Sequence, residues 1–207
     1  MRIGLDFDNT IVCYDELFHC LAAERSLVPA GITMSKSQVR DHLRKTGRED
    51  EWTRLQGEAY GPRIREASPF PGALDFISLC HRESIPLFII SHKTRRPFLG
   101  EPHDLHAAAQ GWLEHHGFFS PGTGLTRADV FLEETKANKL ARIDRQQCSH
   151  FVDDLPEILA DVAFPADTHR ILFSPSNSAV NRASGAAVQS VSSWDQLSSL
   201  LFQGVAP

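Results

Sequence analysis

Short apolar runs recur along the chain, and segments with apolar residues at helical spacing lie between them. Runs of this length, bounded by polar and turn residues, predict buried strands. The predicted strands are Arg2–Asp6, Pro86–Ser91, Asp129–Leu132, His150–Asp153 and Arg170–Ser174. Helices are predicted after Pro71-Gly72, after Asp104, and over Lys136–Asp144, Leu155–Val162 and Trp194–Phe202. Strands that alternate with helices predict an α/β fold with a mostly parallel sheet covered on both faces.

The stretch of residues 14–68 departs from this alternation of strands and helices, because it has helical patterns but no clear strand. Ligands of open α/β sheets bind at the carboxyl ends of the strands, and the stretch leaves the first strand at that end. We therefore expect residues 14–68 to form a small helical cap on a core made of residues 1–13 and 69–207. Such a cap would exclude water and select substrates. The alternative is a helical subdomain that only adds core.

Composition limits the classes of partner and the cellular locations that we expect for the protein. The 207 residues carry a formal net charge of −5, which argues against a general nucleic-acid binder. No apolar stretch approaches the roughly 20 residues of a membrane span, and no signal peptide is recognised. The four cysteines are scattered, without zinc spacing, which favours a reduced, cytoplasmic location. Residues Ser174–Ser193 are rich in Ser, Ala and Asn and are predicted to be a loop or poorly ordered.

Polar residues end four of the predicted strands or directly follow them. Asp6 and Asp8 end the first strand and share one side of it, because side chains two residues apart in a strand point the same way. The others are Ser91, Lys136 and the pair Asp153-Asp154. Parallel strands bring their carboxyl ends to one edge, so these groups should meet. Several carboxylates in one place repel one another, and a divalent cation such as Mg²⁺ together with a lysine would relieve that repulsion.

In this order the motifs resemble those of the haloacid dehalogenase superfamily, a large group of aspartate-nucleophile phosphatases. The resemblance rests on Asp6-Phe7-Asp8-Asn9-Thr10, Ser91, Lys136 and Asp153-Asp154, and it covers the chain from about Arg2 to Ile158. It implies a Rossmann-like core with a helical cap between the first two motifs. Asn9 departs from the family pattern, where glycine is frequent, and this departure affects the turn rather than the chemistry.

The resemblance also implies a role for each residue. Asp6 would attack phosphorus, and Asp8 would protonate the leaving oxygen and then activate water. Ser91 and Lys136 would hold the phosphoryl group. Mg²⁺ would be bound by Asp6, by the backbone carbonyl of Asp8, and by Asp153 or Asp154. Asn9, Thr10, Ser91 and the basic loop residues His92, Lys93 and Arg95 are candidates for binding phosphate or substrate, although a solvated loop explains the basic residues equally well.

Two choices stay open at this point. Lys139 lies one turn beyond Lys136, and we prefer Lys136 as the catalytic lysine because it stands at the helix start. Asp153 is preferred over Asp154 as the metal ligand.

The predicted activity is Mg²⁺-dependent hydrolysis of a small soluble phosphomonoester, such as a sugar phosphate or nucleotide, through an aspartyl-phosphate. A phosphomutase or phosphotransferase and a non-catalytic binding domain are the alternatives.

Overall fold

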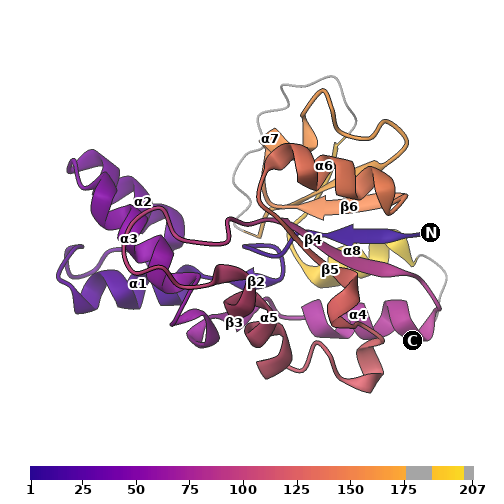
Figure 1. The fold of residues 1–207 in the computed structure, drawn as a ribbon, viewed down its shortest axis with the longest axis horizontal. Coiled ribbons are helices and arrows are strands. Elements are labelled where there is room, and N and C mark those ends of the chain that lie inside the picture. Colours follow the sequence, from indigo (N-terminus) through magenta and orange to yellow (C-terminus); the bar gives the residue numbers. More distant parts are fainter. Residues whose placement is uncertain (176–187, 203–207) are drawn as a thin grey trace. The chain divides into compact units, whose positions relative to one another are not determined.

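The computed structural model describes residues 1–175 and 188–202, and its centre is a six-stranded sheet (Figure 1). The strand order is β5-β4-β1-β6-β7-β8, and each neighbouring pair is parallel. The strands are β1 Ile3–Leu5, β4 Leu87–His92, β5 Val130–Glu133, β6 His150–Asp153, β7 His169–Phe173 and β8 Val188–Val191. The predicted α/β fold with a parallel sheet is therefore confirmed, and the five predicted strands correspond to β1, β4, β5, β6 and β7.

Strand β8 was missed, so the prediction of a loop is wrong for residues 188–191. The segment 176–187 of that loop lies outside the described residues. Within the described residues β8 pairs only with β7, and of its own side chains only that of Val191 is buried. An edge strand with one buried side chain is held mainly by backbone hydrogen bonds. Such bonds require no hydrophobic pattern, so the strand is hard to recognise in the sequence.

Strand β1 lies at the centre of the sheet, and its three residues are all buried. Gly4 is required there, because a Cβ at this position would lie 2.6 Å from Cδ2 of Phe151 on the neighbouring strand β6. This close approach lets the ring of Phe151 pack directly against the backbone of β1.

Helices cover both faces of the six-stranded sheet, as predicted. Figure 1 shows α6 and α7 on one face and α4 and α8 on the other. Their bounds are α4 Ala73–Arg82, α6 Lys136–Arg145, α7 Pro156–Leu159 and α8 Trp194–Leu201, with short 3-10 turns η2 Pro121–Thr123 and η3 Arg127–Asp129. Helix α7 is shorter than the predicted Leu155–Val162, and Val162 is fully exposed.

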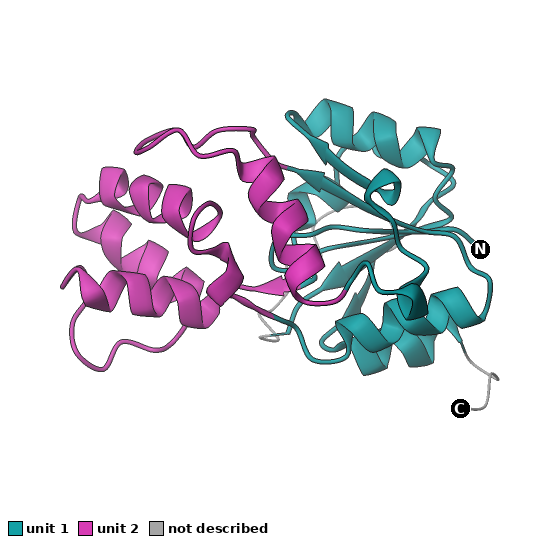
Figure 2. Ribbon diagram, turned by 60° about the horizontal axis from the view of Figure 1, so that its bottom comes forward, with its two compact units in different colours: residues 1–11, 69–92, 118–207 teal, residues 12–68, 93–117 magenta. Residues whose placement is uncertain are grey.

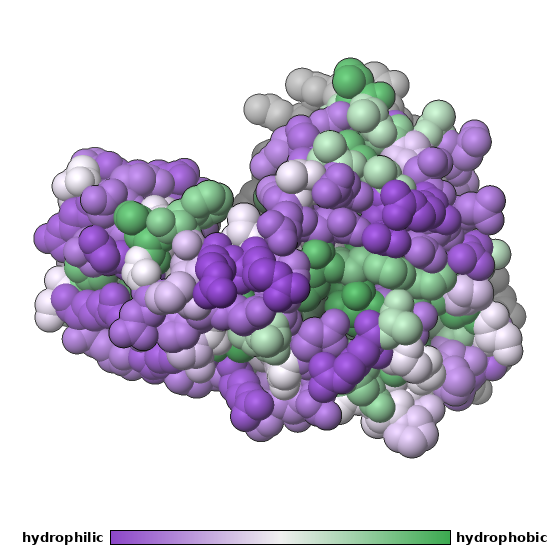
Figure 3. All heavy atoms as spheres, in the orientation of Figure 1, coloured by the Kyte–Doolittle hydropathy of each residue, from purple (hydrophilic) through white to green (hydrophobic). Residues whose placement is uncertain are grey.

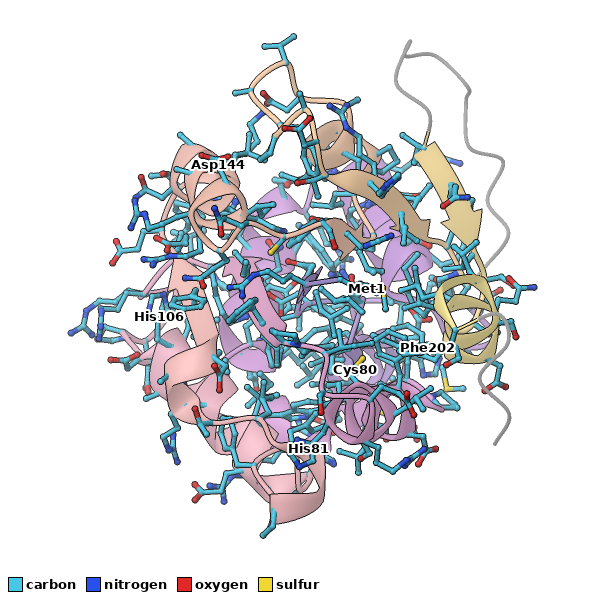
Figure 4. All side chains as sticks on the ribbon, turned by 90° about the vertical axis from the view of Figure 1, so that its right-hand side faces the viewer. Met1, Cys80, His81, His106, Asp144 and Phe202 are labelled. Atoms are coloured by element: carbon cyan, nitrogen blue, oxygen red, sulfur yellow. The ribbon has the colours of Figure 1, made fainter. Side chains whose placement is uncertain are left out.

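The end of the described chain packs on the core. The rings of Phe202 and Phe76 of α4 meet edge to face at 5.9 Å, and Phe202 is almost buried. Figure 4 labels Phe202 beside α8 and Cys80 in α4. Phe76 also contacts the ring of Trp194 at 5.2 Å, so α4 and α8 form one apolar layer against the sheet.

The contacts divide the chain into two compact units, coloured separately in Figure 2. Unit 1 is residues 1–11, 69–92 and 118–207 and contains the sheet; unit 2 is residues 12–68 and 93–117. Unit 2 holds α1 Asp15–Glu24, α2 Lys36–Lys45, α3 Glu49–Ala59, the 3-10 turn η1 Ile64–Glu66 and α5 Leu105–His115. The short strands β2 Val12–Cys13 and β3 Ser68–Pro69 pair where the chain passes between the units.

The predicted cap of residues 14–68 belongs to unit 2, and segment 93–117 joins it there although the sequence assigned that segment to the core. Helix α5 begins as predicted, because the Asp104 side chain accepts a hydrogen bond from the backbone amide of Ala107. The indole of Trp112 in α5 donates to the carbonyl of Ala67 at 2.7 Å, which ties the two segments of unit 2 together. That unit 2 acts as a cap stays a prediction.

Apolar side chains gather over β4 and β5 on one face of unit 1 (Figure 3). A hollow of about 360 Å³ in unit 1 is lined by the end of α4, the beginning of β4 and residues 123–125. Ligands of parallel sheets bind at the carboxyl ends of strands, so a hollow beside the beginning of β4 is at the wrong edge for a catalytic site. No helix within the described residues is long and apolar enough to cross a membrane.

Candidate active site

Asp6 stands directly after β1 and is the centre of the candidate site. Its backbone amide donates to the carbonyl of Val152 in β6 at 2.8 Å, so the residue continues the sheet although it ends the strand. The side chain is buried, with 4% of the residue exposed. Its Oδ1 accepts a hydrogen bond from Ser91 Oγ at 3.0 Å and another from Lys139 Nζ at 2.6 Å. A buried carboxylate with two donors on the same oxygen is fixed in orientation.

Ser91 comes from the carboxyl end of β4, the strand that pairs with β1 on one side. It is buried, and its hydroxyl reaches Asp6 across 85 residues of sequence. The predicted meeting of the first two motifs at one sheet edge is what the structure shows.

Lys139, and not the preferred Lys136, is the lysine whose side chain reaches Asp6 and Asp153. Lys139 is 1% exposed, and its Nζ lies 2.6 Å from both Asp6 Oδ1 and Asp153 Oδ2. Lys136 has a side chain 47% exposed and forms an ion pair with Asp161 at 2.6 Å. Helical side chains lean toward the helix N-terminus. The side chain of Lys139, one turn inside α6, therefore reaches back to the strand ends, whereas that of Lys136 extends past the start of the helix.

The charged groups in this cluster shift one another's pKa values. Burial by itself would lower the pKa of Lys139, but the carboxylates of Asp6 and Asp153 outweigh it and hold that pKa above its ordinary value. Burial raises the pKa of Asp153 to about 7, with the charge of Asp6 adding to the rise and Lys139 opposing it. One ammonium thus faces two buried carboxylates, and the cluster is short of positive charge.

The carboxylates in this negatively charged cluster are suited to bind a metal ion. Asp6, Asp153 and Asp154 each offer a carboxylate oxygen, and these oxygens lie within 4.8 Å of one another. Asp153 is fully buried, and its Oδ1 also accepts from the backbone amide of Leu155 at 3.0 Å, which fixes the carboxylate. Three oxygen donors with excess negative charge suit a hard cation such as Mg²⁺. Asp8 is not in this carboxylate group; the resemblance gave it only a backbone contact to the metal.

The turn after Asp6 explains the unusual Asn9. Asn9 has a φ of 58°, in the left-handed region where asparagine is tolerated better than most side chains other than glycine. The amide of Ile11 then donates to the carbonyl of Phe7 at 3.0 Å and closes the turn. Thr10 is buried in the same turn, and its Oγ1 has no hydrogen-bond partner within the described part of the chain. A buried hydroxyl of this kind is suited to bind a ligand oxygen.

The three candidate basic residues after Ser91 have different environments, and His92 is the last residue of β4 rather than part of a loop. His92 is exposed, whereas Lys93 is buried and its carbonyl is hydrogen-bonded to Nε2 of His106 at 2.7 Å. Arg95 forms an ion pair with Asp104 at 2.8 Å, at the start of α5. The roles of these residues in substrate binding stay predictions.

Comparison with known proteins identifies the fold. The sequence matches no protein-family model and no curated protein. The structure is similar to a dehalogenase with a TM-score of 0.60 and 12% identity, covering 97% of this chain and 96% of that one. It is similar to a HAD family hydrolase from Deinococcus radiodurans R1 with bound phosphate and sodium (TM-score 0.57, 13% identity, 98% and 95% covered). It is also similar to the putative HAD-hydrolase YfnB from Bacillus subtilis bound to magnesium (0.54, 15%, 97% and 98%).

The chain has the haloacid dehalogenase-like fold. Coverage of nearly the whole of both chains decides this, and it confirms the fold that the resemblance of the motifs implies. At these identities the likeness concerns the fold alone. The cluster of Asp6, Ser91, Lys139 and Asp153 lies at the carboxyl ends of β1, β4 and β6, which is where ligands bind in parallel sheets.

Proposed function

We propose that this HAD-like chain is a Mg²⁺-dependent phosphomonoester hydrolase that acts through an aspartyl-phosphate. The observation that carries the proposal is Asp6, a buried carboxylate held by Ser91 and Lys139 at the end of the central strand. Bound phosphate in the Deinococcus hydrolase and magnesium in YfnB support the same chemistry in neighbours of this fold. The substrate is a small phosphorylated metabolite.

The first step is attack by Asp6 on phosphorus. A bond forms between a carboxylate oxygen of Asp6 and phosphorus while the ester P–O bond breaks, and the departing alkoxide takes the proton of Asp8. Lys139 and Ser91 both hold Oδ1 and neither bonds Oδ2, so the carboxylate keeps one orientation during attack. The ammonium of Lys139 also balances negative charge that gathers around the phosphoryl group.

The second step returns the enzyme to its starting state. Water attacks the phosphorus of the aspartyl-phosphate, the bond from phosphorus to Asp6 breaks, and Asp8 accepts the proton of the water. Inorganic phosphate leaves, and Asp6 is again a carboxylate.

Asp6, Asp153 and Asp154 would hold the Mg²⁺ ion. A bound Mg²⁺ supplies electrostatic stabilisation of the phosphoryl oxygens in the transition state. The fixed orientation of Asp153, through its bonds to Lys139 and to the amide of Leu155, preserves the ligand geometry between turnovers.

Asp8 favours phosphoryl transfer over carbon–halogen cleavage, because loss of a halide needs no proton and a phosphomonoester needs one for its leaving oxygen. The free cysteines Cys13, Cys20, Cys80 and Cys148 support the proposal of a reducing, cytoplasmic setting.

Turnover of p-nitrophenyl phosphate with Mg²⁺ tests this function. We expect release of p-nitrophenol by the wild type and a fall to below about one thousandth of that rate in Asp6→Asn, because the amide is not a nucleophile. Asp144→Asn is the matched control: Asp144 is an exposed residue of α6, labelled in Figure 4, and its substitution should leave the rate unchanged.

The same proteins should release no chloride from chloroacetate. Chloride release by the wild type without phosphate release would favour a dehalogenase. A wild type as inert as Asp6→Asn across a broad panel of phosphomonoesters would contradict the enzyme proposal.

A further inference from the structure

The ammonium group of Lys139 has an aromatic neighbour that the mechanism above does not use. Nζ of Lys139 lies over the ring of Phe151, 5.4 Å from the ring centroid. The same Nζ bonds Asp6 Oδ1 and Asp153 Oδ2, each at 2.6 Å. The ammonium is therefore held by two carboxylates and by the face of one aromatic ring, all of them within unit 1.

Strand pairing brings the ring to this position. Phe151 and Asp153 are two residues apart in β6, so their side chains leave the strand on the same face. Gly4 of β1 is the register partner of Phe151 and stands two residues before Asp6. Because Gly4 has no side chain, the ring can lie against β1, where a Cβ would come within 2.6 Å of Cδ2 of the ring. Gly4 thus leaves room for one ring beside the ammonium that both carboxylates bind.

The ring of Phe151 is held in place by apolar neighbours. Phe151 is completely buried and belongs to one hydrophobic cluster with Leu140 and Ile143 of α6. The ring of Phe164 meets it nearly edge to face, with 6.2 Å between the centroids. Lys139 is itself only 1% exposed, so the ring face takes the place of water beside the ammonium. The attraction between a cation and an aromatic face is strongest when both are removed from water.

A buried phenylalanine can serve only to fill space, and a leucine would fill much of the same volume. An aliphatic side chain has no negative face, however, and would leave this side of the ammonium without an attractive partner. The two carboxylates attract the ammonium of Lys139 toward Asp6 and Asp153. An attraction from the ring adds a third direction, and three directions fix the position of Nζ better than two.

We propose that Phe151 is a positioning residue for the reaction, because its ring holds the ammonium of Lys139 where that group fixes Oδ1 of Asp6. The inference rests on the proposed function and adds to it a residue that acts through Lys139 and not on the substrate. Gly4 contributes indirectly, since it makes room for the ring. In the sequence Phe151 is only one apolar residue of a buried strand, and its contact with Lys139 exists only in the folded unit 1.

Fluorinated phenylalanines at position 151 test the inference. Ring fluorines weaken the negative face of the ring with little change in its shape, so the series of none, one, two and three fluorines varies the attraction to the ammonium alone. In urea unfolding of the metal-free protein, we expect the folding equilibrium constant to fall with each fluorine, by about tenfold over the series. With p-nitrophenyl phosphate and Mg²⁺, kcat should fall in the same order, by about three- to tenfold, with a smaller change in KM.

Phe76 is the matched control position. It is a buried phenylalanine of the same unit, and its ring contacts those of Trp194 and Phe202 rather than a cation. The same series at position 76 should change the folding constant and kcat by less than about twofold. In Lys139→Met, fluorination at position 151 should no longer destabilise the protein. The comparison with Phe76 decides the inference even where Lys139→Met is too unstable to fold.

Equal responses at positions 151 and 76, or no dependence on the number of fluorines at position 151, would overturn the inference. It would also be overturned if stability fell along the series while kcat stayed constant, because the ring would then support the fold and not the reaction. Failure of the proposed function has a different signature: the wild type would not turn over p-nitrophenyl phosphate, while unfolding would still follow the number of fluorines.

Discussion

Lys139 is a buried ammonium between two buried carboxylates, Asp6 and Asp153. Buried ion clusters are costly to form, and removing one member leaves the others uncompensated. The residue therefore holds the carboxylate of Asp6 in one orientation and allows two carboxylates to lie close together; in the proposed mechanism it would orient the nucleophile. Lys136, three residues earlier, neutralises Asp161 near the surface, and exposed ion pairs contribute little to stability.

Substitution of Lys139 should be far more harmful to activity and stability than substitution of Lys136. Lys139→Met is expected to lower the rate with aryl phosphate by about 10²-fold or more and to destabilise the metal-free protein by roughly 3–5 kcal/mol. Lys136→Met should change stability by less than about 1 kcal/mol and leave the rate near that of the wild type. Urea unfolding and steady-state kinetics on both variants measure this. Loss of activity in Lys136→Met with normal activity in Lys139→Met would reverse our assignment.

The beginnings of strands β6 and β7 bring two histidines together. His150 and His169 are register partners, and their rings stack with centroids 4.8 Å apart. Burial lowers the pKa of His150, and the neighbouring charges of His169 and the N-terminus lower it further. Strand pairing thus places a titratable group where its protonated form is disfavoured, at the sheet edge opposite the candidate active site.

This pair predicts acid sensitivity. Because the pKa of folded His150 is below the ordinary 6.5, the unfolded chain binds more protons between that value and the folded pKa. The contribution of His150 to stability is therefore lost as pH falls below about 6.5. Thermal unfolding from pH 7.5 to 5 should show a smaller loss in His150→Asn than in the wild type. His81→Asn, an exposed position in α4, should behave like the wild type; equal pH profiles for all three would refute the prediction.

At the scale of the whole molecule, folding gathers charges that are far apart in the sequence. Asp6 follows β1, Asp153 ends β6 and Asp154 follows it, yet each offers a carboxylate oxygen and these oxygens lie within 4.8 Å of one another. Among the described residues, a single lysine, Lys139, bonds the two most deeply buried carboxylates, those of Asp6 and Asp153. A ligand that binds this cluster binds the folded protein alone, because the unfolded chain does not hold the three groups together.

Mg²⁺ should therefore stabilise the protein against heat. At a concentration 100 times its dissociation constant, a ligand that binds only the folded state adds about 2.7 kcal/mol. We expect the unfolding temperature to rise with MgCl₂ relative to NaCl of equal ionic strength, and the rise to be much smaller in Asp154→Asn. Asp167→Asn, an exposed residue of the same unit, is the control. A rise of equal size in Asp154→Asn would place the ion elsewhere.

The sequence by itself determined the parallel sheet and the five of its strands that have a clear apolar pattern. It also determined that Asp6, Ser91 and the Asp153-Asp154 pair lie together at the carboxyl ends of those strands. These features follow from local rules, because hydrophobic runs specify buried strands and parallel strands share the direction of their carboxyl ends. The departure at Asn9 was visible too, and the left-handed backbone there accounts for it.

Only the tertiary structure decided between Lys139 and Lys136, because the choice depends on the direction in which a helical side chain leans once α6 has packed on the sheet. It also decided that β8 joins the sheet beside β7, that residues 93–117 group with unit 2, and that the ammonium groups of Lys36 and Lys93 both lie against the ring of Tyr60. Each of these rests on contacts between distant segments. Such contacts leave no periodicity in the sequence, because each residue is stabilised by a residue from a distant segment and not by its neighbours along the chain.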